Sequence, residues 1–352
     1  MTKVAKINPV SPDQKVIEEA AGVLREGGLV IIPTETVYGI AANMLNKKTL
    51  SRLYEIKKRP KDKPFSLHID RKERIEEFCR AIPVCAYKLI DKFWPGPLTL
   101  ILKSAREAGT IGIRMPDDDI ALKIIGSAEI PVVSPSANIS GGKPPVKFSE
   151  AIKELDGLVD FAIDAGDTKL GVESTIVDLT KETPQILRSG AIRKEDIEAI
   201  IKKKIVLFIC TGNSCRSVMA EALLKKKMKE KKRDDVEVLS AGLMMMGGLG
   251  ATEATKEVLS REGIDVSSHI SQGVTKELIK KSDFILVMEK LQERKILTLA
   301  PEAKNRLFLL KEFAKMKDNQ LDIADPVGRN LEFYEDTLNI IKEAVEKVSE
   351  LI

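Results

Sequence analysis

The sequence predicts two α/β domains joined near Lys202. The chain has 352 residues, more than twice the ~150 residues typical of one domain. Fourteen of its sixteen prolines precede residue 200, so the two halves differ in their use of rigid turns. The stretch from Gly190 to Val206 has the pattern of a polar helix running into an apolar strand, which is typical of a short interdomain connection. We therefore expect domains at residues 1–201 and 202–352.

The first half alternates short β-rich runs with helical patterns. We expect strands in the segments 28–34, 65–69, 98–103, 110–115, 130–136 and 174–179. Apolar residues recur at helical spacing in residues 47–58 and 84–94, which predicts helices there. Strands mixed with helices in this way predict a mixed α/β or α+β domain.

The second half is more regular. Apolar runs predict strands at 204–210, 236–242, 284–288 and 306–310. Helical patterns lie between them at 217–232, 251–263 and 275–282, and a long helix ends the chain. Strands separated by helices predict a parallel, doubly wound sheet, with its site beyond the carboxyl ends of the strands.

The composition is that of a soluble globular protein. Hydrophobic residues make up 43% and charged residues 31% of the chain, which excludes the disordered and collagen-like classes. The formal net charge is +4, and residues 1–200 hold 30 basic and 29 acidic side chains. Neither half therefore has the basic excess of a protein that binds nucleic acid mainly by charge. The N-terminus lacks an apolar signal core, and no apolar run approaches the ~18 residues that span a bilayer, so we expect a cytoplasmic protein without a membrane partner.

Metal-binding residue types are scarce. Four cysteines and two histidines are too few for a disulfide framework and make a structural zinc site improbable. We predict no metal site built from protein side chains.

The segment Cys210 to Ser217 follows an apolar strand and opens a helix. Between its ends lie Thr211, Gly212, Asn213, Ser214, Cys215 and Arg216. A tight loop at this point directs backbone N–H groups inward, and the helix N-terminus adds positive potential, so the loop suits a phosphate dianion. Arg216 can bind two phosphate oxygens at once. The same donors favour the charged thiolate of Cys210, to which the Ser217 hydroxyl can donate.

This segment, with the strings SAG, LLKEF and DPVG downstream, resembles the low-molecular-weight protein phosphatase family over about residues 204–350. The resemblance implies a phosphocysteine intermediate on Cys210, with Arg216 stabilising the equatorial oxygens and with no cofactor. It also implies that Asp325, in an Asp-Pro pair, is the general acid. Two roles stay open for Cys215: a packed small side chain, or the partner of Cys210 in a reversible disulfide that the resemblance implies.

The implied substrate of this half is a phosphorylated protein. The resemblance is closest to the branch of bacterial protein-arginine phosphatases, which has a β-hydroxyl residue at the position of Ser214. Phosphotyrosine enzymes usually have an aliphatic residue there, and the segment 243–250 lacks the aromatic that often flanks a phosphotyrosine pocket. An arsenate reductase is a rival interpretation, but it needs two further cysteines, and none follows Cys215.

Two spacing patterns in the first half suit an anionic ligand. Lys57 and Arg59 lie two residues apart at the end of a helical pattern, and Lys63 follows in a loop stiffened by proline. Three cations on one loop suit a polyphosphate. Ser136 and Asn138 also lie two residues apart after an apolar run, so in extended backbone both face one side and can bind one ligand.

These residues belong to a set of motifs: PTETVYGI, KKRPKDKPFSLHI, WPGPLTLIL, GTIGIRMPDD, SPSANISG, GVESTIVDL and ILRSGAI. With these motifs, about residues 12–200 resemble the YrdC family of threonylcarbamoyl-AMP synthases. The resemblance implies a twisted open α/β domain with a concave basic cavity. L-Threonine, bicarbonate and ATP with Mg²⁺ would give threonylcarbamoyl-AMP and pyrophosphate. The product would pass to the enzymes that modify tRNA at A37, which makes tRNA an indirect partner.

The same resemblance implies a set of binding residues. Those for threonine are Thr36, His68, Arg114 and Ser174. Those for the nucleotide are Lys57, Arg59, Lys63, Thr110, Ser134, Ser136, Asn138 and Arg188. The chain is thus expected to fuse two enzymes. A rival interpretation treats the first half as an RNA-binding or regulatory module without chemistry, but its nearly neutral charge argues against this.

Overall fold

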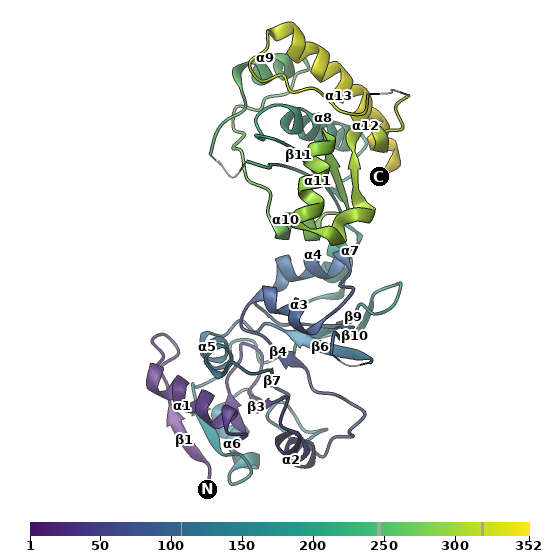
Figure 1. The fold of residues 1–352 in the computed structure, drawn as a ribbon. Helices are drawn as coiled ribbons and strands as arrows, with labels where there is room; N and C mark the ends of the chain where they lie inside the picture. Colours follow the sequence, from purple (N-terminus) through teal and green to yellow (C-terminus); the bar gives the residue numbers. More distant parts are fainter. Residues whose placement is uncertain (107, 245–247, 318–319) are drawn as a thin grey trace. The chain divides into compact units, whose positions relative to one another are not determined.

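The computed structural model describes residues 1–106, 108–244, 248–317 and 320–352. The chain forms two compact units, Met1–Glu198 and Ala199–Ile352, and the division lies within helix α7 (Lys194–Lys202) (Figure 1). Both units mix helices and strands, and the α/β class predicted for each half is confirmed. Within the described ranges, no helix combines the length and the apolar character needed to cross a membrane.

A ten-stranded sheet organises the N-terminal unit, in the order β1-β8-β2-β3-β7-β4-β6-β5-β9-β10. The sheet is mixed, with parallel pairs such as β2 with β8 and antiparallel pairs such as β2 with β3. The strands are β1 (Lys3–Lys6), β2 (Val30–Ile32), β3 (Gly39–Asn43), β4 (Leu67–His68), β5 (Leu98–Lys103), β6 (Thr110–Arg114), β7 (Val132–Val133), β8 (Phe161–Asp164), β9 (Thr175–Asp178) and β10 (Gln185–Arg188).

Helices pack on both faces of this sheet, which explains why consecutive residues of β2 are all buried. Val30 and Ile32 pack in one cluster with Ile17 of α1 and Ile124 of α5. Ile31, on the opposite face, packs in a second cluster with residues of α2 and α6. The helices are α1 (Gln14–Arg25), α2 (Lys47–Lys57), α3 (Ile75–Phe78), α4 (Val84–Phe93), α5 (Asp119–Ala128) and α6 (Phe148–Leu155), with a 3₁₀ turn at Lys72–Arg74.

The C-terminal unit is built on a four-stranded sheet in the order β12-β11-β13-β14, in which every pair is parallel. Its strands are β11 (Lys204–Cys210), β12 (Val236–Gly242), β13 (Phe284–Val287) and β14 (Leu307–Leu309). The parallel, doubly wound sheet predicted for this half is therefore confirmed.

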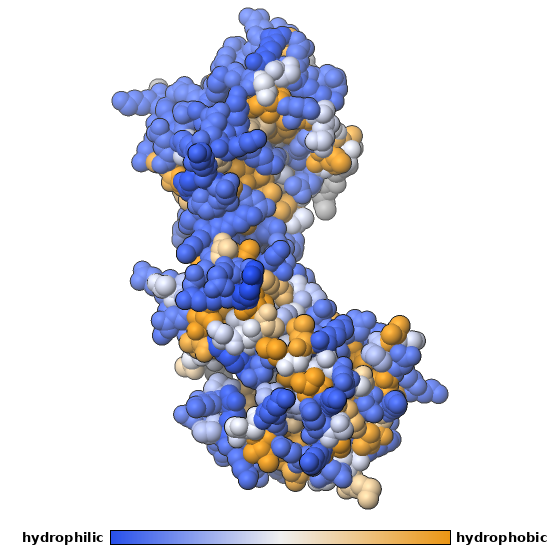
Figure 2. Space-filling model, turned by 180° about the vertical axis from the view of Figure 1, so that it is seen from behind, coloured by the Kyte–Doolittle hydropathy of each residue, from blue (hydrophilic) through white to orange (hydrophobic). Residues whose placement is uncertain are grey.

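The central strand β11 is buried on both faces. Val206 and Phe208 pack against α8 and α13, whereas Leu207 and Ile209 pack against α10 and α11. The helices of this unit are α8 (Arg216–Glu230), α9 (Glu253–Arg261), α10 (Lys276–Lys281), α11 (Lys290–Leu299), α12 (Leu310–Phe313) and α13 (Leu331–Leu351), with a 3₁₀ helix at Pro301–Arg306. On the face of the molecule in Figure 2 most residues are hydrophilic and the apolar ones form scattered patches.

Candidate active sites

The phosphate loop predicted at residues 210–217 connects the end of β11 with the start of α8. Because β12 and β13 lie on opposite sides of β11, the loop lies at the switch point where doubly wound folds bind ligands. Asn213 has a φ of +54°, in the left-handed region that asparagine tolerates better than most residues. Its buried amide donates from Nδ2 to Ser217 Oγ at 3.0 Å and to Ser240 Oγ at 2.7 Å, which fixes the turn.

The Cys210 thiol is held at the bottom of a pocket of about 260 Å³. The backbone N–H of Asn213 donates to Sγ at 3.2 Å, and Ser217 Oγ lies 3.0 Å from Sγ. Since Ser217 Oγ accepts from the Asn213 amide, its own proton is available for the sulfur. Two donors thus point at the Cys210 sulfur.

Arg216 is buried, with 1% of its surface exposed, and lines the same pocket. Nη1 donates to Ile323 O at 2.7 Å and lies 3.2 Å from a Glu289 carboxylate oxygen. Nη2 donates to Asp325 Oδ2 at 2.5 Å. Nε is buried and has no hydrogen-bond partner among the residues that the structure describes. A buried donor without a partner is costly, and an anion in the loop would supply the missing acceptor.

Asp325 lines the pocket at its rim, with its side chain 39% exposed. The predicted general acid, the nucleophile and the arginine therefore share one pocket. Cys215 lies in the lining as well, with Sγ 3.4 Å from Thr252 Oγ1 and 3.7 Å from the Tyr334 hydroxyl. All four cysteines lie in the described part of the chain, and no disulfide joins any of them.

The rest of the pocket lining combines two hydroxyl side chains with glycine and apolar residues. Its other lining residues are Thr211, Gly212, Ser214, Met244, Leu249 and Val327. No aromatic residue belongs to this lining, as far as the structure describes the chain. Part of the segment 243–250 in the sequence prediction, residues 245–247, lies outside the described residues.

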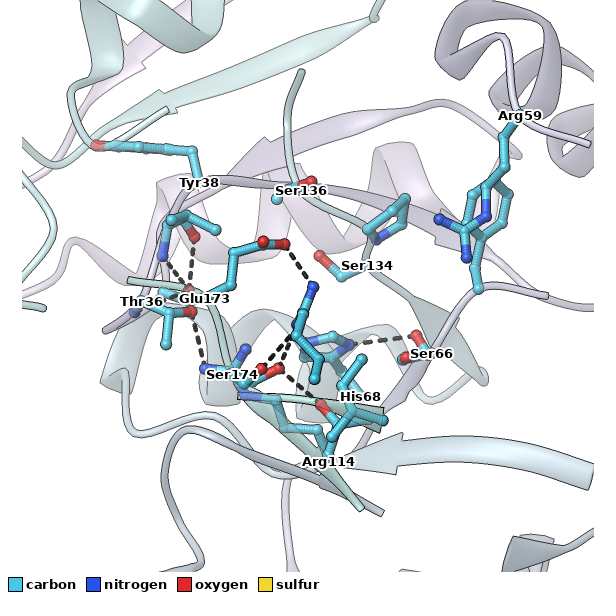
Figure 3. A pocket seen from close by; sticks show the side chains of 18 residues that line it. Thr36, Tyr38, Arg59, Ser66, His68, Arg114, Ser134, Ser136, Glu173 and Ser174 are labelled. Atoms are coloured by element: carbon cyan, nitrogen blue, oxygen red, sulfur yellow. Dashed lines mark hydrogen bonds and ion pairs between the residues drawn. The ribbon is translucent and has the colours of Figure 1, made fainter. Parts of the chain in front are cut away.

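The N-terminal unit has a cavity of about 130 Å³ (Figure 3). Eight residues of the predicted threonine and nucleotide sets line it: Thr36, Arg59, His68, Arg114, Ser134, Ser136, Ser174 and Arg188. Strands β4, β6 and β10 end at this cavity and present His68, Arg114 and Arg188 to it. Residues from motifs that are far apart in the chain thus lie together in one cavity.

Arg114 and Thr36 form the buried end of the cavity. Arg114 Nη2 donates to Thr36 Oγ1 at 2.9 Å, and its Nε donates to Gly96 O at 3.2 Å. The Glu35 carboxylate lies 2.7 Å from Nη2, although neither of its oxygens has hydrogen-bond geometry. The Glu35 charge therefore balances that of Arg114 within the interior.

His68 is buried beside this pair. Loss of hydration, together with the positive charge of Arg114, lowers the pKa of His68 to about 3. The imidazole is thus neutral over the whole physiological range, and it can offer a ligand a hydrogen bond but no charge.

Arg188 and Ser174 form the opposite wall. Arg188 donates from Nη2 to Ser174 Oγ at 2.9 Å and from Nη1 to Glu173 Oε1 at 2.6 Å. Burial lowers the pKa of Arg188 from its usual value, but a guanidinium remains charged under these conditions.

Four predicted nucleotide residues do not line the cavity: Lys57, Lys63, Thr110 and Asn138. Lys57 is buried, and its Nζ donates to Ser136 O at 2.6 Å and to Asn138 O. Burial and the nearby charge of Arg59 lower the pKa of Lys57 to about 8. Lys57 therefore holds the backbone of the Ser136–Asn138 segment, instead of joining Arg59 in a cluster of cations. Lys63 contributes a carbonyl oxygen, which accepts from Arg59 Nε at 2.8 Å.

Both acidic residues of this site were absent from the residues predicted from the sequence. Glu35 lies inside PTETVYGI and Glu173 directly precedes Ser174, so each was adjacent to a residue that was selected. The sequence feature that could have pointed to them is a charged residue next to a predicted buried strand or turn. An uncompensated charge is costly there, so such a residue is expected to have a charged partner.

Comparison with known proteins agrees with a chain of two domains. A family model for Sua5, YciO and YrdC, described as "Telomere recombination", matches residues 22–190. A model for the low molecular weight phosphotyrosine protein phosphatase matches residues 205–352.

Individual relatives match the N-terminal unit. The threonylcarbamoyl-AMP synthase of Pyrococcus abyssi is 43% identical over 193 residues, which cover 53% of this chain and 57% of the relative. The chain thus spans little more than half the length of this relative. The putative threonylcarbamoyl-AMP synthase of Methanocaldococcus jannaschii is 37% identical over 200 residues, which cover 54% of this chain and 94% of the relative.

Solved structures are similar to both halves. The crystal structure of P. abyssi Sua5 complexed with L-threonine matches with a TM-score of 0.55 and 29% identity, and covers 82% of this chain and 100% of that chain. The arginine phosphatase YwlE from Geobacillus stearothermophilus matches with a TM-score of 0.38 and 36% identity, and covers 42% of this chain and 92% of that chain. The chain belongs to the Sua5/YrdC family through its N-terminal unit, and its C-terminal unit is a low molecular weight phosphatase domain.

Proposed function

We propose that the N-terminal unit is a threonylcarbamoyl-AMP synthase that uses L-threonine, bicarbonate and ATP. The observation that carries this proposal is the cavity in which Arg59 and Arg188 face Thr36, Ser174 and the neutral His68. Arginines suit the phosphates of a nucleotide, and hydroxyls suit a small polar substrate. The threonine bound to P. abyssi Sua5 supports the same choice of substrate.

The reaction needs alignment and charge neutralisation more than a protein nucleophile. The threonine amine attacks bicarbonate, forms a carbamate and releases water. A carbamate oxygen then attacks the α-phosphorus of ATP, a P–O bond forms, and the bond to the β-phosphate breaks so that pyrophosphate leaves with the electron pair. Arg59 and Arg188 would neutralise the phosphate oxygens. Mg²⁺ would enter on the triphosphate. The buried Ser134 hydroxyl, which has no hydrogen-bond partner in the described part of the chain, would fit it as an oxygen ligand.

We infer that the product serves tRNA modification at A37, in the cytoplasm, through partner enzymes. The alternative, a module that binds RNA without chemistry, makes a different prediction. It requires salt-sensitive tRNA binding without ATP-dependent pyrophosphate release. Measuring tRNA binding and ATP-dependent pyrophosphate release on the full chain distinguishes the synthase from the RNA-binding module.

We propose that the C-terminal unit is a cysteine-dependent protein phosphatase. Cys210 Sγ would attack phosphorus, the bond from phosphorus to the leaving group would break, and Asp325 would donate a proton to that group. Water, deprotonated by Asp325, would then attack the phosphocysteine and release phosphate. The observation that carries this proposal is the common pocket of Cys210, Asp325 and Arg216, whose Nε has no acceptor within the described ranges.

We propose phosphoarginine as the preferred substrate over phosphotyrosine. Ser214 lines the pocket, so a polar hydroxyl is available to a guanidinium, and the described lining offers no aromatic ring to stack on a phenol. Rates on matched phosphoarginine and phosphotyrosine peptides test this, with Ser214→Val as the informative variant. We expect Ser214→Val to lower the ratio of the phosphoarginine rate to the phosphotyrosine rate. An unchanged ratio would remove Ser214 as the source of the preference.

The two activities are expected to be independent. Cys210→Ser should abolish phosphatase activity and leave ATP-dependent pyrophosphate release unchanged, because the nucleophile of one site plays no part in the other. Lys57→Ala should do the reverse, because it removes the ammonium group that holds Ser136 O and Asn138 O. Each variant thus controls for the folding of the other. Loss of both activities in either variant would contradict separate sites.

A further inference from the structure

The N-terminal cavity contains one acidic side chain whose role the proposed reaction leaves open. Three arginines line the cavity, namely Arg59, Arg114 and Arg188, and among the described lining residues Glu173 is the only carboxylate. The Glu35 carboxylate, which balances Arg114, is buried and does not belong to this lining. Glu173 is therefore the one group that can offer a full negative charge to a ligand in the cavity.

Glu173 has acceptor capacity to spare. Oε1 accepts from Arg188 Nη1 at 2.6 Å, and Oε2 has no hydrogen-bond partner in the part of the chain that the structure describes. The side chain is about one-third exposed, at 36%, and Figure 3 shows it among the side chains that converge on the pocket.

The hydroxyls nearby are less suited to bind a cation. Thr36 Oγ1 already accepts from Arg114 Nη2, and Ser174 Oγ already accepts from Arg188 Nη2. Each hydroxyl is thus polarised by a guanidinium, which opposes a second positive charge at the same oxygen.

The backbone of Glu173 is held firmly. Ala191 N donates to Glu173 O at 3.0 Å, and Arg188 Nε donates to Ser174 O at 2.9 Å. Gly190 packs so closely on this segment that a Cβ added to it would lie 2.5 Å from Ser174 C. A carboxylate on such a fixed backbone is already oriented before the ligand arrives.

We propose that Glu173 binds the α-ammonium group of the amino-acid substrate and thereby makes this cavity specific for amino acids. The inference rests on the proposed synthase function. An ammonium group that leaves water for a cavity lined by three guanidinium groups needs a charged acceptor, and Glu173 supplies it. The contact also fixes the nitrogen from which the carbamate forms.

The test compares three variants of the full chain: Glu173→Gln, Glu173→Asp and Glu182→Gln. Glu182 is an exposed acid on the turn between β9 and β10, which makes it a matched control. Threonine binding is measured by calorimetry without ATP, and the KM values for threonine and ATP by pyrophosphate release. Loss of one charge-assisted hydrogen bond should weaken threonine binding by about tenfold or more in Glu173→Gln. Glu173→Asp should recover part of it, and Glu182→Gln should match the wild type.

A substrate analogue excludes a merely structural role. In 2,3-dihydroxybutanoate of the threonine configuration a hydroxyl replaces the ammonium group. The wild type should bind threonine more tightly than this analogue, whereas Glu173→Gln should bind the two about equally. If Glu173→Gln still discriminates between them, or if the KM for ATP and the Mg²⁺ requirement change in place of the KM for threonine, the proposal is wrong.

The same experiments separate this inference from the proposed function. Threonine binding that depends on Glu173, in a wild-type protein that releases no pyrophosphate, would support the ammonium site and contradict the synthase. Pyrophosphate release with a threonine KM unaffected by Glu173→Gln would support the synthase and overturn the ammonium site.

Discussion

At the scale of single residues, His68 is the clearest case of burial that controls chemistry. Its pKa is lowered to about 3 by loss of hydration and by Arg114, whereas in the unfolded chain it has the ordinary value of ~6.5. Between these values the unfolded state binds more protons than the folded state, so the stability of the unit falls as the pH drops from about 6.5 towards 3.

We predict that His68→Gln makes this loss of stability shallower, because glutamine has no proton to gain. The wild type should lose on the order of a few kcal/mol more than the variant between pH 7 and pH 4. Urea unfolding followed by fluorescence measures this in the N-terminal unit alone, because Trp94 is the only tryptophan of the chain. Equal pH dependence of variant and wild type would show that folding does not lower the pKa of His68.

The residue scale also shows what a sequence can reveal. The spacing of Cys210 and Arg216 predicted a shared pocket, because both ends of a tight strand-to-helix loop must face the same anion. The spacing of Lys57 and Arg59 did not predict that the side chain of Arg59 lines the cavity whereas that of Lys57 does not. Lys57 is the last residue of α2, and its side chain extends to the carbonyls of another segment. Sequence spacing alone carries no information about that segment.

At the scale of elements, most of the strands lie inside predicted segments, whereas β1, β3, β8 and β10 do not. The strands β2, β5, β6 and β11 lie inside predicted segments. The strand β3 has the sequence GIAAN and β1 has KVAK, and these small or alternating polar residues give little β signal. They are strands because neighbouring strands pair with them, which is a tertiary effect.

The close packing of the segment after β10 on the start of β9 leads to a prediction for Gly190. An added Cβ would lie 2.5 Å from Ser174 C and 2.6 Å from Thr175 N, which are backbone atoms that cannot turn away. Gly190→Ala should therefore displace the backbone of Glu173 and Ser174 and destabilise the N-terminal unit by ~1–3 kcal/mol. Pyrophosphate release should fall, and phosphatase activity should remain.

The matched control is Gly126→Ala. Gly126 lies within helix α5, and its added Cβ would come no closer than 3.4 Å to Asp70 Oδ2. Alanine is the better helix former, so this variant should be neutral or slightly more stable. Unfolding followed by Trp94 fluorescence compares the two variants. Equal stability of both would mean that the packing at Gly190 is not tight.

At the scale of the whole molecule, two separate cores imply two unfolding events. The units have their own sheets and their own buried clusters, and each contains one candidate site. A chain of this kind departs from two-state behaviour when its domains unfold independently. The single tryptophan lies in the N-terminal unit, whereas circular dichroism follows helices of both units.

We predict that ligands shift these two transitions one at a time. A ligand at about 100 times its Kd adds roughly 2.7 kcal/mol to the unit that binds it, which raises the melting temperature of a domain of this size by about 5–10 °C. Phosphate or vanadate should raise the melting temperature of the transition that circular dichroism detects and Trp94 fluorescence does not, which is that of the C-terminal unit. ATP with threonine should raise only the transition that Trp94 reports. A single ligand that raises both transitions would show that the two units unfold as one body.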